Sequence, residues 1–315
     1  MFSGQGSQYF HMGKELLDSS AVFREWMQRL DRHVYALTGQ SCLTVIYDSG
    51  KSIGDVFDLT AFTHPSIFMV EYALARTLIA KNIVPEYILG ASLGEFCALV
   101  LAGCLSWEEA LLLVVKQAGI AEQKCEPGGM LAILDNPENF DRYTFLHTQC
   151  ELAAVNFPSH FVVSGLTSKL ENIKHELRIR NAVFQDIWIK QAFHSKNIDP
   201  VKNDFQAALS NVRFKKPQIP LISCTTGGLI TDIPQYHLWD VCRKPVKFQK
   251  TIAALENENN FLYLDLGPSG TLATFVKYNL ADKSDSVTLP TLTPYNDAIK
   301  NIARIENNLK ELEMA

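Results

Sequence analysis

Residues 90–94 read G-x-S-x-G, a pattern that can make a serine into a nucleophile. They follow the apolar residues 87–89, which favour a strand, and precede residues 95–101, which have a helical composition. A sharp strand-to-helix turn lifts the hydroxyl out of the sheet, and glycines flank it because side chains there would collide with neighbouring backbone. The sequence therefore predicts a nucleophilic Ser92. A glycine-bounded turn that merely contains serine is the alternative.

A serine hydroxyl needs a base for its proton, and His194 is the candidate among the eight histidines. It lies where a predicted inserted domain returns the chain to a larger one, and clefts form at domain junctions. The glycine-rich residues 4–6 are flexible enough to bring a backbone N–H near an oxyanion, and the N–H of Leu93 directly follows the nucleophile. The alternative for His194 is a histidine that only packs or forms structural hydrogen bonds. The alternative for residues 4–6 is a turn without a catalytic role.

Strands and helices alternate on both sides of a central segment. Helices are expected over residues 61–81, 95–101, 107–124, 202–210, 246–255 and 301–314, and strands over residues 84–89, 219–224 and 261–266. Ser106 followed by Glu109 is a capping box that marks a helix start. This alternation predicts a mostly parallel sheet with helices on both faces.

The central segment has a different order of elements. After the break at residues 127–129, strands are expected over residues 130–134, 151–155, 160–164 and 183–187, with a polar helix after the first and a helix at 168–178 after the third. Strand-helix-strand-strand-helix-strand is the ferredoxin-like order. We therefore expect an α/β fold in which residues 1–126 and 193–315 form a large parallel-sheet subdomain and residues 127–192 an inserted ferredoxin-like one.

Composition narrows the functional classes. With 47% hydrophobic and 20% charged residues, the chain can build a substantial core. It has no apolar run of the roughly 18–20 residues that a membrane span needs and no leader pattern, so we expect a cytoplasmic protein. A net charge of −5 without a basic stretch argues against nucleic-acid binding. The seven cysteines form no C-x-x-C pair or His/Cys cluster, so no metal is expected and the thiols should be reduced.

Taken together, the motifs resemble the malonyl-CoA:acyl carrier protein transacylase family, the acyltransferases of fatty-acid and polyketide synthases. The matching segments span the chain: residues 2–8, 90–95, 154–156, 162–165, 192–195, 243–248 and 267–268. The resemblance implies a hydrolase-like α/β subdomain with a ferredoxin-like insertion. It also implies that Ser92 is acylated, that His194 is its base, and that the N–H groups of Gln5 and Leu93 form the oxyanion hole.

The resemblance further implies that Asn156 binds substrate and that a backbone carbonyl near Val241 orients His194. No resident cofactor is implied, because coenzyme A or 4′-phosphopantetheine arrives as part of the substrate. The implied partner is an acyl carrier protein, and we expect a monomer. Carrier proteins are acidic, so the basic residues Arg243, Lys244 and Lys247 are candidates for steering them, with ordinary solvated charges as the alternative.

Three residues depart from the family pattern. Malonyl-loading members carry an arginine where this chain has Gln117, and a neutral amide cannot form the charge-assisted bidentate pair with a carboxylate. Lys116 should not substitute, because it points about 100° away on the helix. Ala91 replaces a common histidine and His64 a common glutamine, which would reshape the pocket or place a water; neutral drift is the alternative.

A chain without the carboxylate clamp but with serine, histidine and oxyanion loop resembles the acyl hydrolases of trans-acyltransferase polyketide synthases. These relatives remove short acyl groups from stalled carrier proteins. We therefore expect hydrolysis of acyl-carrier-protein thioesters through acyl-Ser92. The first alternative is transfer of malonyl or another acyl group from coenzyme A to a carrier protein. The second is an inactive docking subunit, which the intact Ser92 and His194 disfavour.

Overall fold

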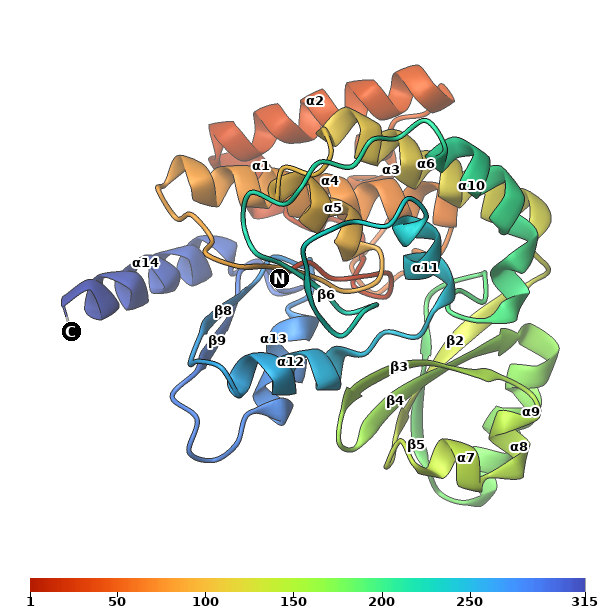
Figure 1. Ribbon diagram of the computed structural model, residues 1–315. Coiled ribbons are helices and arrows are strands. Elements are labelled where there is room, and N and C mark those ends of the chain that lie inside the picture. The colour runs from red at the N-terminus through yellow and green to blue at the C-terminus, as the bar shows by residue number, and fades with distance from the viewer. Residues whose placement is uncertain (315) are drawn as a thin grey trace.

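The computed structural model describes residues 1–314 and has two parts (Figure 1). In the large part, helices cover mostly parallel strands, and an inserted antiparallel sheet lies at one side of it. In the large part, β1 (Ile88–Gly90) pairs in parallel with β6 (Leu221–Ser223), and β7 (Gly228–Ile230) pairs antiparallel with β6. β8 (Leu262–Asp265) and β9 (Val287–Pro290) form a second parallel pair. The α/β architecture is as predicted.

Residues 1–2 connect the two strand groups. The Phe2 N–H donates to the Leu89 carbonyl at 2.9 Å, and the Ala91 N–H donates to the Phe2 carbonyl at 3.0 Å. On the other side, the Leu266 N–H donates to the Met1 carbonyl at 3.0 Å. The glycine-rich loop that follows therefore starts from the middle of the sheet, beside the strand that leads to Ser92.

The strand predicted over residues 84–89 is only partly present, because β1 begins at Ile88. Val84 is 65% exposed and Tyr87 40% exposed, so their apolar character does not reflect burial in a sheet. A run of apolar residues indicates a strand only where their side chains are buried, and the sequence alone does not show which side chains are buried.

Helices cover the large sheet, and most of the predicted ones are present. They are α1 (Lys14–Ser19), α2 (Ala21–Thr38), α3 (Cys42–Ile46), α4 (Thr60–Ala80), α5 (Gly94–Leu101), α6 (Trp107–Lys124), α10 (Lys202–Leu209), α11 (His237–Arg243), α12 (Phe248–Glu256), α13 (Thr271–Asn279) and α14 (Ala298–Met314). The predicted capping box is formed: Ser106 accepts from the Glu109 N–H, and the Glu109 carboxylate accepts from the Ser106 N–H. Within residues 1–314, no helix combines the length and apolar character needed to cross a membrane.

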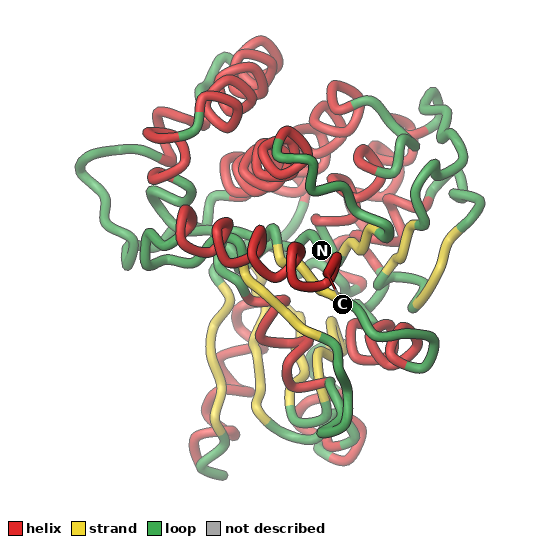
Figure 2. The backbone as a smooth tube through the Cα atoms, turned by 90° about the vertical axis from the view of Figure 1, so that its left-hand side faces the viewer, coloured by secondary structure: helices red, strands yellow, loops and turns green. Residues whose placement is uncertain are grey.

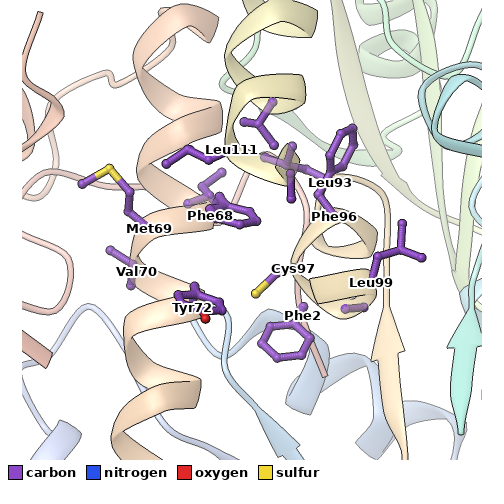
Figure 3. Packing of buried hydrophobic residues seen from close by; sticks show 14 of the residues in the cluster. Phe2, Phe68, Met69, Val70, Tyr72, Leu93, Phe96, Cys97, Leu99 and Leu111 are labelled. Carbon is purple, nitrogen blue, oxygen red and sulfur yellow. The ribbon is translucent and has the colours of Figure 1, made fainter. Parts of the chain in front are cut away.

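The main core joins α4, α5 and α6 behind the turn that carries Ser92. Phe68, Phe96 and Leu111 are at most 1% exposed. Figure 3 shows Phe68 of α4 and Cys97 of α5 directed into the space between their helices, with Phe2 below them. Burial of this kind contributes roughly 1.5–3 kcal/mol for each large apolar side chain. The core therefore holds α5 rigidly in place.

The inserted part has the predicted ferredoxin-like order. Its strands are β2 (Gly128–Leu134), β3 (Glu151–Phe157), β4 (His160–Leu166) and β5 (Val183–Ile187), in the antiparallel order β3-β4-β2-β5. The expected first helix is divided into α7 (Asn139–Arg142) and α8 (Thr144–His147), and α9 (Thr167–Ile179) is the second. Figure 2 shows this part projecting below the helical layer.

Alternation along β2 gives the inserted sheet two different faces. Leu131 and Ile133 pack with Leu170 of α9 in a separate core, whereas Met130 and Ala132 line a cleft toward the large part. Successive side chains in a strand point to opposite faces, so one strand can serve both surfaces. The inserted sheet thus forms a wall of the cleft.

Gly94→Ala tests how closely the turn after Ser92 packs against the first residues of the chain. A Cβ at Gly94 would overlap the Phe2 carbonyl and lie 2.6 Å from the Ser3 carbonyl oxygen. We expect a loss of about 1–3 kcal/mol in the free energy of unfolding, measured by urea denaturation. Gly119→Ala in α6 is the matched control, because its Cβ meets no atom within 4 Å. Equal stability of the two variants would contradict this packing.

Candidate active site

Ser92 lies on a strained turn between β1 and α5. Its φ is 54°, in the left-handed region that non-glycine residues seldom adopt. A Cβ at Gly90 would lie 2.5 Å from the Glu95 Cα, so the turn requires glycine there. Such strain persists only where surrounding structure enforces it, and it is concentrated at active sites. The geometry is that of the predicted nucleophile turn.

The structure brings Ser92 and His194 together across 102 residues of sequence: the Ser92 Oγ lies 2.7 Å from the His194 Nε2. His194 also has a left-handed φ of 59°. Its backbone N–H donates to the Cys242 carbonyl at 2.8 Å. Nucleophile and base are therefore in hydrogen-bond contact before any substrate binds.

The carbonyl that orients His194 belongs to Lys244, and the expected position near Val241 is wrong. The His194 Nδ1 lies 2.7 Å from the Lys244 oxygen. Val241 lies inside α11, where carbonyls point along the helix axis, whereas Lys244 caps the helix in an extended conformation. Val241 instead lines the cleft.

The environment of His194 keeps its ring neutral. Burial lowers its pKa to about 4, although the Lys244 carbonyl and the charge of Glu95 act in the opposite direction. The neutral ring donates its Nδ1–H to Lys244, which leaves the lone pair on Nε2 facing the Ser92 hydroxyl. His194 is thus in the protonation state of a base.

The low pKa of His194 predicts a distinctive pH profile. The base must be neutral, so kcat/KM should stay constant from about pH 8 to pH 6 and fall only as the pH approaches about 4. The measurement is kcat/KM for an acyl thioester across that range, corrected with the Ser92→Ala rate. An inflection near the ordinary histidine pKa would contradict the neutral buried ring.

The glycine-rich loop passes directly over the nucleophile. A Cβ at Gly4 would lie 2.7 Å from the Ser92 Cβ, which is why the loop needs glycine there. Within the described residues, the N–H groups of Gln5 and Leu93 have no hydrogen-bond acceptor. Two free donors beside Ser92 suit a developing oxyanion.

Glu71 of α4 holds this loop, and the sequence analysis did not identify it. Its Oε1 accepts from the Ser3 N–H at 2.6 Å and from the Ser3 hydroxyl at 2.8 Å. The loop also closes on itself, because the Ser7 hydroxyl donates to the Gly4 carbonyl at 2.8 Å. Complete burial raises the pKa of Glu71. The single acidic residue of a predominantly apolar helix was the available signal.

A second unpredicted group ties the Ser92 helix to the His194 support. Glu95 of α5 accepts from the Thr225 N–H at 2.9 Å and hydroxyl at 2.7 Å, and its other oxygen lies 2.8 Å from the His237 Nε2. His237 begins α11, whose far end supplies the Lys244 carbonyl. Both partners are buried, so removing either leaves an unpaired polar group.

The cleft between the two parts has a volume of about 490 Å³, and the remaining predicted site residues line it: Ala91, His64, Gln117 and Asn156. The Asn156 amide contacts the His160 Nδ1 at 3.0 Å on the wall formed by the inserted sheet. None of the described residues that line the cleft is lysine or arginine. The described chain also contains no group of three or more His, Cys, Asp or Glu residues that could hold a metal ion.

His64 and Gln117 line the cleft and are both buried. The His64 Nε2 contacts the Gln5 Oε1 at 2.5 Å, and the Gln117 Nε2 donates to the Cys242 Sγ at 2.9 Å. Burial lowers the pKa of His64 to about 3, although a side-chain hydrogen bond with Gln117 acts in the opposite direction. Gln117 is uncharged and the His64 ring is neutral, so neither supplies the cation that malonyl-loading relatives of the predicted family are expected to have at position 117.

The predicted basic rim is largely neutralised. Arg243 donates to Glu151 at 3.0 Å and to Asp199 at 2.9 Å, and the Lys244 ammonium donates to Asp240 at 2.7 Å. The Arg243 contact to Glu151 joins α11 to the first residue of β3. Arg243 and Lys244, two of the three candidate residues, thus form ion pairs within the protein. Electrostatic steering of a carrier protein by these residues stays a prediction.

The comparisons with known proteins agree with this geometry. The family model described as "Acyl transferase domain" matches residues 1–315. The polyketide biosynthesis acyltransferase homolog PksD of Bacillus subtilis is 39% identical over 97% of this chain and 94% of its own. The homolog BaeD of Bacillus velezensis is 40% identical over 98% of this chain and 95% of its own.

Among solved structures, a malonyl CoA-acyl carrier protein transacylase from Clostridium perfringens superposes with a TM-score of 0.81. It is 24% identical, over 99% of this chain and 97% of that chain. At this identity the likeness concerns the fold, and it supports a large α/β subdomain with a ferredoxin-like insertion.

Proposed function

The chain belongs to the acyl transferase domain family, whose members act on acyl thioesters, and from this premise we propose that it hydrolyses acyl-carrier-protein thioesters in polyketide biosynthesis. The acyl groups are short and uncharged, and they pass through an ester with Ser92. The polyketide context rests on the names of PksD and BaeD.

The first step forms the acyl-enzyme. The Ser92 Oγ attacks the thioester carbonyl carbon while the His194 Nε2 takes its proton, over the 2.7 Å that separates the two atoms. The carbonyl oxygen becomes an oxyanion that receives hydrogen bonds from the N–H groups of Gln5 and Leu93. The carbon–sulfur bond then breaks, and His194 returns the proton to the leaving thiol.

The second step releases the acid. Water attacks the ester carbonyl and gives a proton to His194, the bond to the Ser92 Oγ breaks, and the serine recovers the proton. The residues named here need no resident cofactor, because coenzyme A or 4′-phosphopantetheine is part of the substrate. The Lys244 carbonyl stabilises the imidazolium that forms in each step.

One observation carries the preference for uncharged acyl groups: no lysine or arginine lines the cleft among the described residues. A malonyl carboxylate would lose its hydration without gaining a charged partner, a cost of several kcal/mol. Gln117 supplies only a neutral amide, whose nitrogen is already bonded to the Cys242 Sγ. An acetyl group requires no such partner.

The second candidate is transfer of an acyl group from coenzyme A to a carrier protein. The family match favours it, because transfer and hydrolysis use the same acyl-enzyme and differ only in whether a thiol or water resolves it. An inactive docking subunit is disfavoured by the intact contact between Ser92 and His194.

The deciding experiment follows acetyl-loaded carrier protein with and without a second, unloaded carrier protein. We expect free acetate at a rate well above that of Ser92→Ala, even when the acceptor thiol is present. Acetyl transfer to the second carrier protein at a rate exceeding acetate release would instead establish the transferase function.

A further inference from the structure

Glu95 is the acidic residue nearest in sequence to Ser92, and its buried carboxylate accepts three hydrogen bonds. Its Oε1 accepts from the N–H and the hydroxyl of Thr225, at 2.9 Å and 2.7 Å. Its Oε2 lies 2.8 Å from the His237 Nε2, which donates because a carboxylate oxygen only accepts. Burying a carboxylate is costly unless donors surround it in this way, so both contacts are strong constraints on the chain.

The contact with His237 fixes the start of the helix that supports the base. His237 is the first residue of α11, and the helix ends at the residue before Lys244. Because α11 has only seven residues, a fixed first turn determines where its last carbonyls lie. Those carbonyls hold His194: its Nδ1 lies 2.7 Å from the Lys244 oxygen, and its backbone N–H donates to the Cys242 carbonyl.

The contact with Thr225 fixes the chain on the other side of the same support. Thr225 follows Cys224, whose carbonyl accepts from the Lys247 N–H at 2.8 Å. Lys247 lies three residues after Lys244, so this hydrogen bond ties the end of the supporting segment to the neighbour of Thr225. Glu95 is therefore bonded near both ends of the segment whose carbonyls orient the base.

The charge of Glu95 acts on the same base. Burial lowers the pKa of His194 to about 4, and the Lys244 carbonyl and the Glu95 charge both oppose this effect. Both ring nitrogens are already engaged, with Ser92 and Lys244, so the carboxylate acts without a direct hydrogen bond to the ring. A negative charge at this position favours the imidazolium that forms when His194 takes the serine proton.

We propose that Glu95 is a positioning residue for the base His194, acting through the Lys244 carbonyl. His237 and Thr225 transmit the constraint along the chain. The inference rests on the proposed function only in that the nucleophile is acylated with this histidine as its base. None of the three residues Glu95, His237 and Thr225 lines the cleft, so their effect should fall on the chemical step and not on substrate binding.

Glu95→Gln tests this role, because it removes the charge and keeps a side chain of the same size. Intact mass spectrometry follows single-turnover acylation of Ser92 by increasing concentrations of acetyl-loaded carrier protein. We expect the limiting rate constant to fall about 10- to 100-fold, while the half-saturating concentration stays within about twofold. An unchanged rate constant in folded protein would overturn the proposal, as would a change confined to the half-saturating concentration.

Glu256→Gln is the matched control. Glu256 also accepts three hydrogen bonds, from the hydroxyl groups of Tyr263, Ser284 and Ser286 at 2.8, 2.7 and 2.8 Å, and it lies outside the cleft lining. Its replacement should lower the stability of the fold and leave the acylation rate constant at the wild-type value. An equal loss of rate in both variants would show a general effect of losing such a carboxylate and would overturn the proposal.

Two substitutions of His237 test the path through α11, and they decide if Glu95→Gln does not fold. His237→Leu removes the donor to Glu95 and should slow acylation to a similar extent. His237→Gln keeps an amide that can donate to the carboxylate and should acylate at close to the wild-type rate. Equal rates in these two variants would overturn the path from Glu95 to the base.

This measurement is independent of how the acyl-enzyme is resolved, because acylation of Ser92 precedes the competition between water and a thiol. A hydrolase test that fails while Glu95→Gln slows acylation would overturn only the proposed function. Acetate release by the wild type together with an unchanged acylation rate in Glu95→Gln would overturn only the positioning role.

Discussion

Ser92→Ala is expected to lower kcat/KM for acyl thioesters by about 10⁴- to 10⁶-fold, the range observed when a serine nucleophile is removed. The alanine has no atom to form the ester, and His194 then has no hydroxyl to deprotonate. The measurements are acetate release from acetyl-loaded carrier protein and labelling by a serine-directed fluorophosphonate. Both signals should disappear.

Ser210→Ala provides the matched control. Ser210 is exposed at the end of α10, and its hydroxyl donates only to the Ala207 carbonyl. It should label and turn over like the wild type. An acyl adduct on folded Ser92→Ala protein would show that another residue is the nucleophile, and the mechanism proposed here would be wrong.

Gln117→Arg is expected to increase the rate of Ser92 acylation by malonyl-CoA by about 10- to 100-fold. The guanidinium can form a charge-assisted bidentate pair with the malonyl carboxylate, where the wild-type cleft lining offers no lysine or arginine. The neighbouring His64 is neutral, because burial lowers its pKa to about 3, and so it does not repel the new cation. Intact mass spectrometry of malonylated enzyme measures the change.

Gln149→Arg adds the same charge outside the cleft and should leave malonyl acylation unchanged. The rate at which acetyl thioesters acylate Ser92 should not rise in the Gln117→Arg variant, because an acetyl group has no free carboxylate to pair with the arginine. Rapid malonyl loading of the wild-type enzyme would contradict the argument from the uncharged cleft. Failure of the arginine variant to gain malonyl loading, despite folding, would show that residue 117 does not face the carboxylate.

Local patterns predicted much of the fold because they depend on residues near in sequence. The helix α6 begins at Trp107 as expected, since its capping box is formed by Ser106 and Glu109 within a single turn. The order of elements in the inserted part likewise identified its ferredoxin-like sheet. The strand prediction was wrong at residues 84–87, which precede β1, because the apolar pattern does not show that Val84 and Tyr87 are exposed.

The site was predicted only in part. Ser92 and the glycine loop were recognisable because turn chemistry requires glycine at particular positions. The carbonyl that orients His194 was misplaced by three residues, from Val241 to Lys244, because the end of α11 determines which carbonyl is free. Glu71 and Glu95 were missed, since their partners lie far away in sequence.

The sequence by itself determined the nucleophile turn, the alternation of elements and the uncharged residue at position 117. These features are local, because they depend on glycine conformational freedom, side-chain periodicity and the absence of a charge on one side chain. Only the tertiary structure decided that His194 reaches Ser92, that its ring is neutral, and that buried His64 and Gln117 line the same cleft. Those properties arise from burial and long-range contact, which exist only after the chain has packed.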